Sequence, residues 1–588
     1  MMVLSLSSVP ACQGPRKWLM LAVLAGWSLS LAGCATTDVS KVPSGTLYGN
    51  YLAARYATSQ HQTERAASYY HDALAIDPSS GVLLERAFLM SVAAGDIDRA
   101  LAISDPLLRS DPSDRLARLV LALHDVKDGS YDDAREELKA AAPGPFAELI
   151  GTLTRAWASA GQGKKDDAIK ALDTFKGRAA FDLFRVYHQA LILDMLGDAK
   201  GAEAAYLDAM GQTGSTSIRI VLAYASFLDR QGHADRARTV IQQYQALAPD
   251  NPLTEQALAS LDSKAVLPPL VSSPAEGVAE ALYGLSSALV RDQGVDLAEL
   301  YVNLALYLRP DFDLAQILLA EVYEQDKRFD MAAKLYRSIN PASPLYPDAQ
   351  IQAALALDQQ DKESEALALL RDVEAKNPRL VDAVIAQADI LRGNQKFAEA
   401  TPLYARAIAM TGGKQDPRFW TLYYARGICY ERTGQWPLAE KDLKLALELS
   451  DDNPMVLNYL GYSWIEQHKN LDQALDMLKK AVDARSDDGF VVDSLGWAYF
   501  KLGHYDQAVD YLVRSVELEP NDATINEHLG DALWMAGDKI DARFQWAHAL
   551  EMKPDADKVK PLQRKLVFGL DFSTTSADSG ARPAVPGS

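Results

Sequence analysis

One stretch of the sequence decides the fold: residues 491–520 read VVDSLGWAYFKLGHYDQAVDYLVRSVELEP. Ala508 lies 13 residues after Leu495, and Pro520 follows 12 residues after Ala508. The apolar positions on either side of Gly503 recur at helical spacing, and Gly and Pro are residues that end helices. The stretch therefore predicts two helices that meet at a turn around Gly503, the second of which stops at Pro520.

The same pattern repeats along most of the chain. Leu-Gly pairs begin at Leu460, Leu495 and Leu529, at steps of 35 and 34 residues. Small residues at these places let two helices approach closely, while Leu and aromatic side chains fill the space between them. The Ala position recurs at steps of mostly 34 residues, at Ala66, Ala100, Ala134, Ala168, Ala202, Ala237, Ala298, Ala332, Ala366, Ala400, Ala439, Ala474, Ala508 and Ala542. The sequence therefore predicts about fourteen helix pairs.

The period has one long interruption. Ala237 and Ala298 are 61 residues apart, and the excess falls in residues 250–277. This segment contains Pro268-Pro269 and a Ser-Ser-Pro sequence, which are typical of a loop or linker. We therefore expect two arrays separated by a linker, although Leu253 to Leu261 could form a helix.

The first residues have the composition of an export signal. Arg16 and Lys17 precede an apolar run of about 15 residues, which is shorter than the roughly 20 residues of a spanning helix. The run ends at Leu31-Ala32-Gly33-Cys34, which resembles the lipobox of bacterial lipoproteins. That resemblance implies cleavage before Cys34 and a lipid on its thiol. Because Ala35 replaces the Asp that often retains lipoproteins in the inner membrane, we expect a lipid-anchored protein of the outer membrane that faces the periplasm.

These patterns give the chain an expected order of segments. For the N-terminal residues up to Cys34, the alternative interpretation is an ordinary signal peptide or a short anchor helix. The segments are a signal peptide (1–33), a lipidated tether (34–45), an N-terminal array (46–250), a linker (251–277), a C-terminal array (278–556), a capping helix (557–570) and a disordered tail (571–588).

Composition and motifs argue against nucleic-acid binding and against catalysis. The 588 residues carry a formal charge of −20, whereas a dedicated nucleic-acid binder needs a basic face. Three cysteines cannot form a disulfide framework or a four-thiolate metal site. Residues 161–164 read GQGK but lack the Gly spacing and the following Ser or Thr of a phosphate-binding loop. We therefore expect no enzyme, no catalytic residue, no metal and no cofactor.

The helix pairs resemble the tetratricopeptide repeat (TPR), which implies an all-α solenoid that forms a right-handed superhelix. In TPR proteins the first helix of each pair lines a concave groove. Its groove-facing residues lie two before, two after and five after the Leu of the Leu-Gly pair. The resemblance therefore implies a candidate peptide-binding groove at Asn458, Tyr462, Ile465, Asp493, Trp497, Phe500, Glu527, Asp531 and Trp534.

These candidate residues are largely aromatic and acidic. Exposed aromatic side chains can anchor an extended peptide or a partner helix; the alternative is that they pack against adjoining helices. The TPR carboxylate clamp, which holds acidic peptides, needs Lys, Arg and Asn at these positions, and only Asn458 matches it. The partner segment is therefore expected to be basic or apolar.

A narrower resemblance concerns two segments near the C-terminal end. Residues 491–497 (VVDSLGW) and 528–534 (HLGDALW) are similar to the adaptor lipoproteins that scaffold periplasmic carboxyl-terminal processing proteases. This implies a noncatalytic adaptor in the bacterial envelope that delivers substrates to such a protease. A component of an outer-membrane assembly, secretion or polysaccharide-export machine is the alternative, and an enzyme with an unrecognised site is a third reading.

Overall fold

The computed structural model describes residues 45–142, 144–211, 217–292, 294–413 and 416–570. The predicted signal peptide, Cys34, nearly all of the tether and the tail 571–588 lie outside these residues. Within them the regular secondary structure is helical, without a strand, so the all-α prediction is confirmed. In the same residues, no helix has both the length and the apolar character needed to cross a bilayer.

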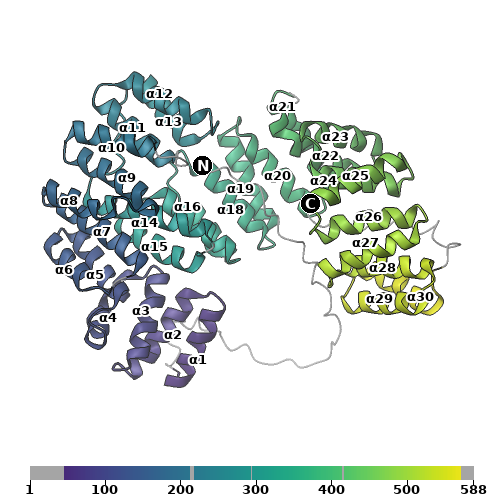
Figure 1. The fold of residues 1–588 in the computed structure, drawn as a ribbon, viewed down its shortest axis with the longest axis horizontal. Coiled ribbons are helices and arrows are strands. Elements are labelled where there is room, and N and C mark those ends of the chain that lie inside the picture. Colours follow the sequence, from purple (N-terminus) through teal and green to yellow (C-terminus); the bar gives the residue numbers. More distant parts are fainter. Residues whose placement is uncertain (1–44, 143, 212–216, 293, 414–415, 571–588) are drawn as a thin grey trace, which may run out of the picture. The chain divides into compact units, whose positions relative to one another are not determined.

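The helices follow one another as a solenoid of pairs (Figure 1). Two short 3₁₀ helices, η1 (Asp173–Phe175) and η2 (Pro417–Phe419), interrupt them, and α13 (Pro252–Asp262) and α30 (Ala556–Phe568) stand outside the pairs. The first seven pairs are α1 (Leu47–Ser59) and α2 (Thr63–Ile76), α3 (Gly81–Ala93) and α4 (Ile97–Ser110), α5 (Arg115–Asp128) and α6 (Tyr131–Ala140), α7 (Pro145–Gly161) and α8 (Lys165–Leu172), α9 (Ala179–Met195) and α10 (Ala199–Gly211), α11 (Ile218–Arg230) and α12 (Ala234–Gln245), α14 (Pro274–Arg291) and α15 (Val295–Leu308).

The remaining pairs complete the array. They are α16 (Asp313–Gln325) and α17 (Phe329–Arg337), α18 (Tyr346–Asp358) and α19 (Glu363–Lys376), α20 (Val381–Gly393) and α21 (Phe397–Met410), α22 (Trp420–Arg432) and α23 (Trp436–Leu449), α24 (Pro454–Glu466) and α25 (Leu471–Ala484), α26 (Gly489–Lys501) and α27 (Tyr505–Leu518), α28 (Ala523–Ala536) and α29 (Lys539–Glu551).

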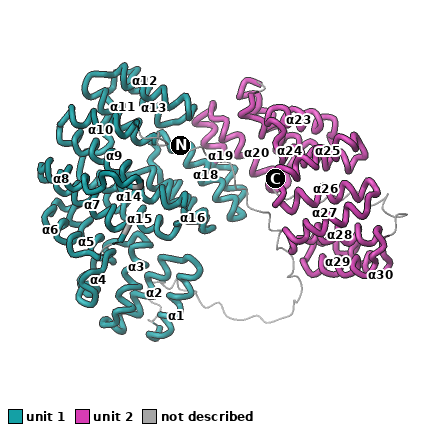
Figure 2. Tube along the Cα trace, in the orientation of Figure 1, with its two compact units in different colours: residues 1–5, 30–369 teal, residues 6–29, 370–588 magenta. Residues whose placement is uncertain are grey.

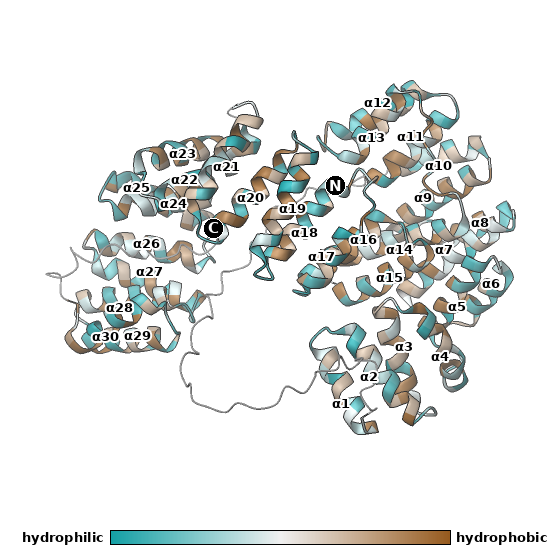
Figure 3. Cartoon of the chain, turned by 180° about the vertical axis from the view of Figure 1, so that it is seen from behind, coloured by the Kyte–Doolittle hydropathy of each residue, from teal (hydrophilic) through white to brown (hydrophobic). Residues whose placement is uncertain are grey.

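As the sequence predicted, small residues let the two helices of each pair approach closely. All of the recurring Ala residues, from Ala66 to Ala542, have 0% of their surface exposed. A Cβ added to Gly496 would lie 2.7 Å from the side chain of Leu512, so only glycine permits this approach of α26 to α27. Gly503 has a φ of +82°, which glycine adopts without strain, and it forms the turn between these helices. Hydrophobic and hydrophilic residues alternate along the helices, as Figure 3 shows, because one side of each helix is buried.

The chain divides into two compact units. Among the described residues, unit 1 comprises 45–369 and unit 2 comprises 370–570 (Figure 2). The division falls within α19, and not at the segment 251–277 that we expected to separate two arrays. The sequence period stops at that segment, but the packing of unit 1 continues across it.

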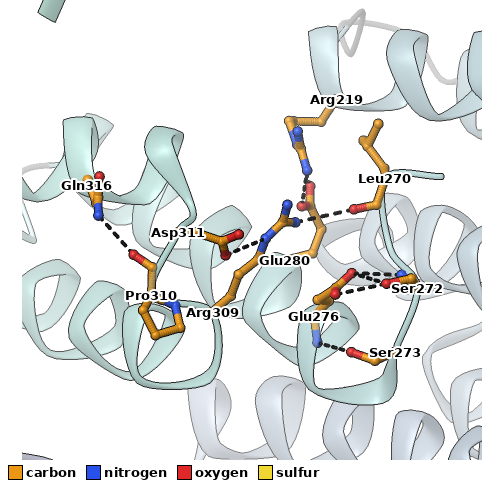
Figure 4. Close-up of polar contacts among 10 residues, drawn as sticks. All are labelled: Arg219, Leu270, Ser272, Ser273, Glu276, Glu280, Arg309, Pro310, Asp311 and Gln316. Atoms are coloured by element: carbon orange, nitrogen blue, oxygen red, sulfur yellow. Dashed lines mark hydrogen bonds and ion pairs between the residues drawn. The ribbon is translucent and has the colours of Figure 1, made fainter. Parts of the chain in front are cut away.

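The segment expected to be a linker is ordered by specific contacts. It contains α13 and then an extended strap, residues 264–273, whose prolines prevent helix formation. The hydroxyl of Ser226 on α11 donates to the carbonyl of Pro268 at 2.6 Å, and the backbone N–H of Leu267 donates to Asp229 at 2.9 Å. Figure 4 shows the C-terminal end of the strap, where Arg309 donates to the carbonyl of Leu270 at 3.3 Å.

The strap leads into α14 and α15, which pack against the first helices of earlier pairs. In Figure 1 they lie beside α5, α7 and α9, and α14 contacts these three helices while α15 contacts α3 and α5. Gly277 on α14 lies directly against the indole of Trp157, and any side chain there would overlap that ring. The first helices α3, α5, α7 and α9 are thus covered by helices of the same unit.

Buried polar contacts fix this packing. Glu280 on α14 is 3% exposed and accepts both Nε of Arg219 at 2.8 Å and the hydroxyl of Tyr187 at 3.1 Å (Figure 4 shows the Arg219 contact). Burial would raise the pKa of Glu280, but the Arg219 guanidinium outweighs it and the pKa lies below its ordinary value. On α15, the amide of Asn303 donates to the carbonyl of Ala93 at 2.7 Å.

Candidate protein-binding surface

The first helices of unit 2 form a continuous surface near its C-terminal end. Helix α24 contacts α26, and α26 contacts α28, so side chains on neighbouring first helices meet. We call the side chains of α22, α24, α26 and α28 that meet in this way the first-helix surface. The hydroxyl of Tyr459 donates to Glu431 of the preceding first helix at 3.2 Å. In the same manner, His528 Nδ1 lies 2.9 Å from Asp493.

Trp497 is at the middle of the first-helix surface and is half-buried. Its ring stacks on Phe500 at a centroid distance of 4.7 Å and on His528 at 3.9 Å, with interplanar angles of 15° and 16°. Its Nε1 donates to Glu466 at 2.7 Å, and the ammonium of Lys501 lies 5.2 Å from the ring centroid. Trp497 therefore packs against adjoining side chains and still presents part of its surface. Its role as an anchor stays a prediction.

Asn458 and Tyr462 lie one helix earlier, on α24. Asn458 is 8% exposed, and its Oδ1 has no hydrogen-bond partner among the described residues. Tyr462 is half-buried, and burial, together with the nearby carboxylates of Glu466 and Asp493, raises its pKa well above the ordinary value. Carboxylates beside a half-buried aromatic ring favour a ligand that brings hydrogen-bond donors and positive charge.

Two other predicted positions are more deeply packed. Phe500 is 8% exposed and lies between Trp497 and Tyr505, and Ile465 is fully buried. These two side chains therefore offer a partner little surface.

The predicted residues on α28 are occupied by the chain's own C-terminal helix. Lys565 on α30 donates to Glu527 at 2.6 Å and to Asp531 at 2.7 Å. Trp534 packs on Trp546 at 5.4 Å, and Gly569 lies so close to the Trp534 indole that a Cβ there would overlap it. Helix α30 thus takes the place that the next first helix would have, as expected for a capping helix.

Charge is concentrated at the α26–α28 junction. Burial would lower the pKa of His528, but the carboxylate of Asp493 overrides it, and Glu527 and Asp531 add to the effect, so the pKa lies above its ordinary value. Burial raises the pKa of Asp531, and Lys565 opposes this rise. The protonated His528 is therefore stabilised between Asp493 and the Trp497 ring.

Sequence reasoning missed several residues that shape this surface. Glu466 and Lys501 contact Trp497, and Glu431 accepts from Tyr459. Lys565 neutralises Glu527 and Asp531. A signal for two of these residues was present, because Glu431 and Glu466 lie 35 residues apart, one repeat period. Glu466 and Lys501 directly follow the groove positions Ile465 and Phe500, and Lys565 lies on α30, so the positions known for the TPR do not include them.

Two further groups could have carried chemistry. Cys429 is a fully buried free thiol whose pKa is raised to about 12 by burial, which makes it unreactive. In the described part of the chain, His61, Asp296 and Asp326 could offer a metal three ligand atoms that lie within 4.8 Å of one another. Because His61 and Asp296 are exposed and His61 already pairs with Asp326 at 3.6 Å, we assign no metal to this group.

Parts of this chain are similar in sequence to known proteins. The tetratricopeptide repeat family model matches residues 91–148, 385–454 and 494–557. A TPR repeat-containing protein of Pseudomonas aeruginosa is 33% identical over 92 residues, which are 16% of this chain and 16% of that protein. A lipoprotein NlpI homolog of Haemophilus influenzae is 29% identical over 99 residues, which are 17% of this chain and 31% of that protein. The alignments thus span less than a third of either relative.

Among solved structures, a chain in the crystal structure of the APC/C hetero-tetramer Cut9–Hcn1 aligns with 89% of this chain and 96% of its own length. The two chains have 16% sequence identity and a TM-score of 0.38. The family match covers helices of both units, and the same pairing of helices, with a fully buried Ala in each pair, extends beyond the matched segments. The protein is therefore an all-helical solenoid of helix pairs, and three of its segments match the tetratricopeptide repeat.

Proposed function

We propose that this protein is a noncatalytic scaffold, anchored by a lipid on Cys34 in the outer membrane of a bacterium and facing the periplasm. Its first-helix surface in unit 2 would bind a basic or apolar segment of a partner protein. TPR proteins generally bind proteins or peptides, and the similarity to a lipoprotein homolog is consistent with an envelope role. The lipobox sequence at residues 31–34 supports the anchor.

One observation carries the binding proposal. The first-helix surface combines a half-buried Trp497, a half-buried Tyr462 and the unpaired Oδ1 of Asn458 within a series of carboxylates. An aromatic surface can hold the stem of a Lys or Arg side chain while the carboxylates accept hydrogen bonds from its head. This chemistry favours a cationic segment over an acidic peptide.

The resemblance of residues 491–497 and 528–534 to protease adaptors decides which partner is tested first. Pull-down from an envelope extract with the mature chain is expected to recover a carboxyl-terminal processing protease. Recovery of barrel-assembly, secretion or polysaccharide-export proteins alone would contradict protease delivery and favour the alternative scaffold.

The surface itself is tested by Trp497→Ala, with Phe544→Ala as a matched control. Phe544 is a 68% exposed aromatic residue on a second helix, α29, outside the first-helix surface. Trp497→Ala is expected to weaken partner binding by roughly 30-fold, the effect of losing one hot-spot residue, while the control leaves binding unchanged. Equal binding by both variants, measured by calorimetry with the recovered partner, would contradict the assignment of this surface.

The anchor has a separate test. Cys34→Ala is expected to abolish incorporation of labelled fatty acid and to release the protein from the membrane fraction. Unchanged fractionation and labelling would refute the anchor while leaving the binding surface untouched.

A further inference from the structure

Helix α1 presents an apolar stripe to solvent. Tyr48 is 78% exposed, Leu52 is 64% exposed and Tyr56 is 67% exposed, and their spacing of four residues places them on one side of the helix. The opposite side, with Ala54 and Ala57, is buried in unit 1. Because α1 is the first helix that the structure describes, no earlier described helix packs on this stripe.

The stripe has the composition of a segment that lies at a membrane interface. Tyrosine combines an apolar ring with a polar hydroxyl, and it concentrates at the boundary between lipid and water. From residue 45 to residue 60 the single charged side chain is that of Arg55, although the whole chain has a charge of −20. Helix α1 itself therefore lacks the acidic groups that would repel it from an anionic membrane.

The position of the stripe in the chain favours a bilayer over other occupants. Tyr48 follows Cys34 by 14 residues, so even a fully extended chain keeps Tyr48 within about 50 Å of a lipid on Cys34. A lipid on Cys34 would thus hold α1 within reach of the membrane at all times. A second copy of the chain is a weaker candidate, because a stable interface needs about 800 Å² per partner and three side chains supply only part of this area.

We propose that the stripe of Tyr48, Leu52 and Tyr56 lies on the lipid bilayer surface and orients unit 1 against the membrane. This inference rests on the proposed lipid on Cys34. The contact is interfacial: the rings and Leu52 enter the headgroup region with the axis of α1 parallel to the surface, and the contact depends little on salt.

The experiment uses the full, lipidated protein in vesicles of three parts phosphatidylethanolamine to one part phosphatidylglycerol. An environment-sensitive dye is attached to Leu52→Cys, and in a matched variant to Ile540→Cys, because Ile540 is an 85% exposed apolar residue of α29 in unit 2. The native thiols do not interfere, since Cys34 would be acylated and Cys429 is fully buried. Spin-labelled lipids are expected to quench the dye at position 52, with a blue shift of its emission, but not the dye at position 540.

A second variant measures the contribution of the stripe without the anchor. In a Cys34→Ala background, Leu52→Ser is expected to reduce partitioning onto the same vesicles roughly tenfold, the factor for burying one leucine side chain. Ile540→Ser is expected to leave partitioning unchanged, and salt should alter neither result.

Each outcome separates the inference from its premise. A protein that stays bound through Cys34 while the dye at position 52 remains unquenched would overturn the inference and leave the anchor intact. Shielding of that dye that rises with protein concentration without lipid would overturn it in favour of self-association. A wild-type protein without lipid on Cys34 would overturn the anchor and, with it, this inference.

Discussion

The two units of this protein use their first helices in different ways. In unit 1, the first helices α3, α5, α7 and α9 are covered by α14 and α15 of the same unit. In unit 2, the first helices α24, α26 and α28 contact one another and present the half-buried Tyr462 and Trp497. In unit 1 the surface of these first helices is thus covered by helices of the same unit, whereas in unit 2 the corresponding surface is a candidate binding surface.

The difference teaches that a repeat pattern does not reveal whether its first-helix surface is available. In each unit, part of the surface formed by the first helices is covered, and a buried ion pair fixes the covering helix in place. Glu280 does so in unit 1, where its side chain is 2% exposed beside Arg219. Lys565 on α30 does so in unit 2, beside Asp531, whose side chain is 7% exposed. Removing one partner of each ion pair therefore measures how much that pair contributes to the stability of the covering helix.

The largest effect is expected from Glu280→Leu, which removes the ion pair between α14 and Arg219 in unit 1. Arg219 would remain buried without its counter-ion, and Tyr187 would lose its acceptor, so we expect the free energy of unfolding of unit 1 to fall by about 3–5 kcal/mol. Hydrogen exchange should rise in α14 and in the strap, residues 264–273, but not in unit 2. Denaturant unfolding with hydrogen exchange read by mass spectrometry measures both effects.

A double variant provides the control for this prediction. Arg219→Met together with Glu280→Leu removes both charges, so most of the lost stability should return. If the single variant left unit 1 unchanged, the ion pair would not be what holds α14 against the first helices, and the packing of Gly277 on Trp157 would be the main cause.

A smaller effect is expected from Lys565→Met in unit 2. Glu527 and Asp531 would lie close together without a cation, and we expect α28 to α30 to lose about 2–3 kcal/mol of stability. Asp531 would keep the indole N–H of Trp546 as a donor at 2.9 Å, which relieves part of the cost of losing Lys565. Thermal unfolding followed by tryptophan fluorescence reports this through Trp534 and Trp546.

Neutralising the two carboxylates distinguishes two explanations of that loss of stability. In Glu527→Gln with Asp531→Asn, the substitution Lys565→Met should cost little, because no anion remains unpaired. A loss of equal size in that background would mean that the stem of Lys565, and not its charge, holds α30 in place.

Much of this fold could be predicted from the sequence, because the repeat is a local property. Each recurring Ala is fully buried, and a helix, Ala556–Phe568, lies where we expected a capping helix over residues 557–570. The packing of α14 and α15 against α3 to α9 depends on contacts between distant residues, such as Tyr187 with Glu280 and Asn303 with Ala93, which are 93 and 210 positions apart and which a period of 34 does not encode. The prolines of the strap predicted a break in helix, whereas its attachment through Ser226 and Asp229 depends on tertiary geometry.

The candidate surface was predicted only in part for the same reason. The groove positions of the TPR led to Trp497 and Asp493, which do lie together on neighbouring turns of α26 with His528 between them. Glu527, Asp531 and Trp534 follow the same rule, yet α30 occupies them. Whether an end repeat is free depends on the helix that caps it, and no rule of spacing within the repeat contains this information.

The smallest predicted effect compares one buried histidine in each unit. His188 in unit 1 is 1% exposed and accepts Nε1 of Trp157 at 3.1 Å, and burial lowers its pKa to about 4. Its contribution is present above the unfolded pKa of 6.5 and is lost as the pH falls towards 4, because only the unfolded chain then takes up the proton. The pKa of His528 is raised, so its contribution is present below 6.5 and is lost as the pH rises through the folded value.

His188→Asn and His528→Asn test this opposition, since each places an amide where Nδ1 stood. Between about pH 6.5 and 5.5, the stability that wild type gains over His188→Asn should shrink by about 1 kcal/mol, one pKa unit of linkage. The stability gained over His528→Asn should instead shrink as the pH rises above about 6.5. Hydrogen exchange in α9 and α28 reads the two units separately, and the same sign of change at both histidines would contradict the assignment of His528 as a cation held by Asp493.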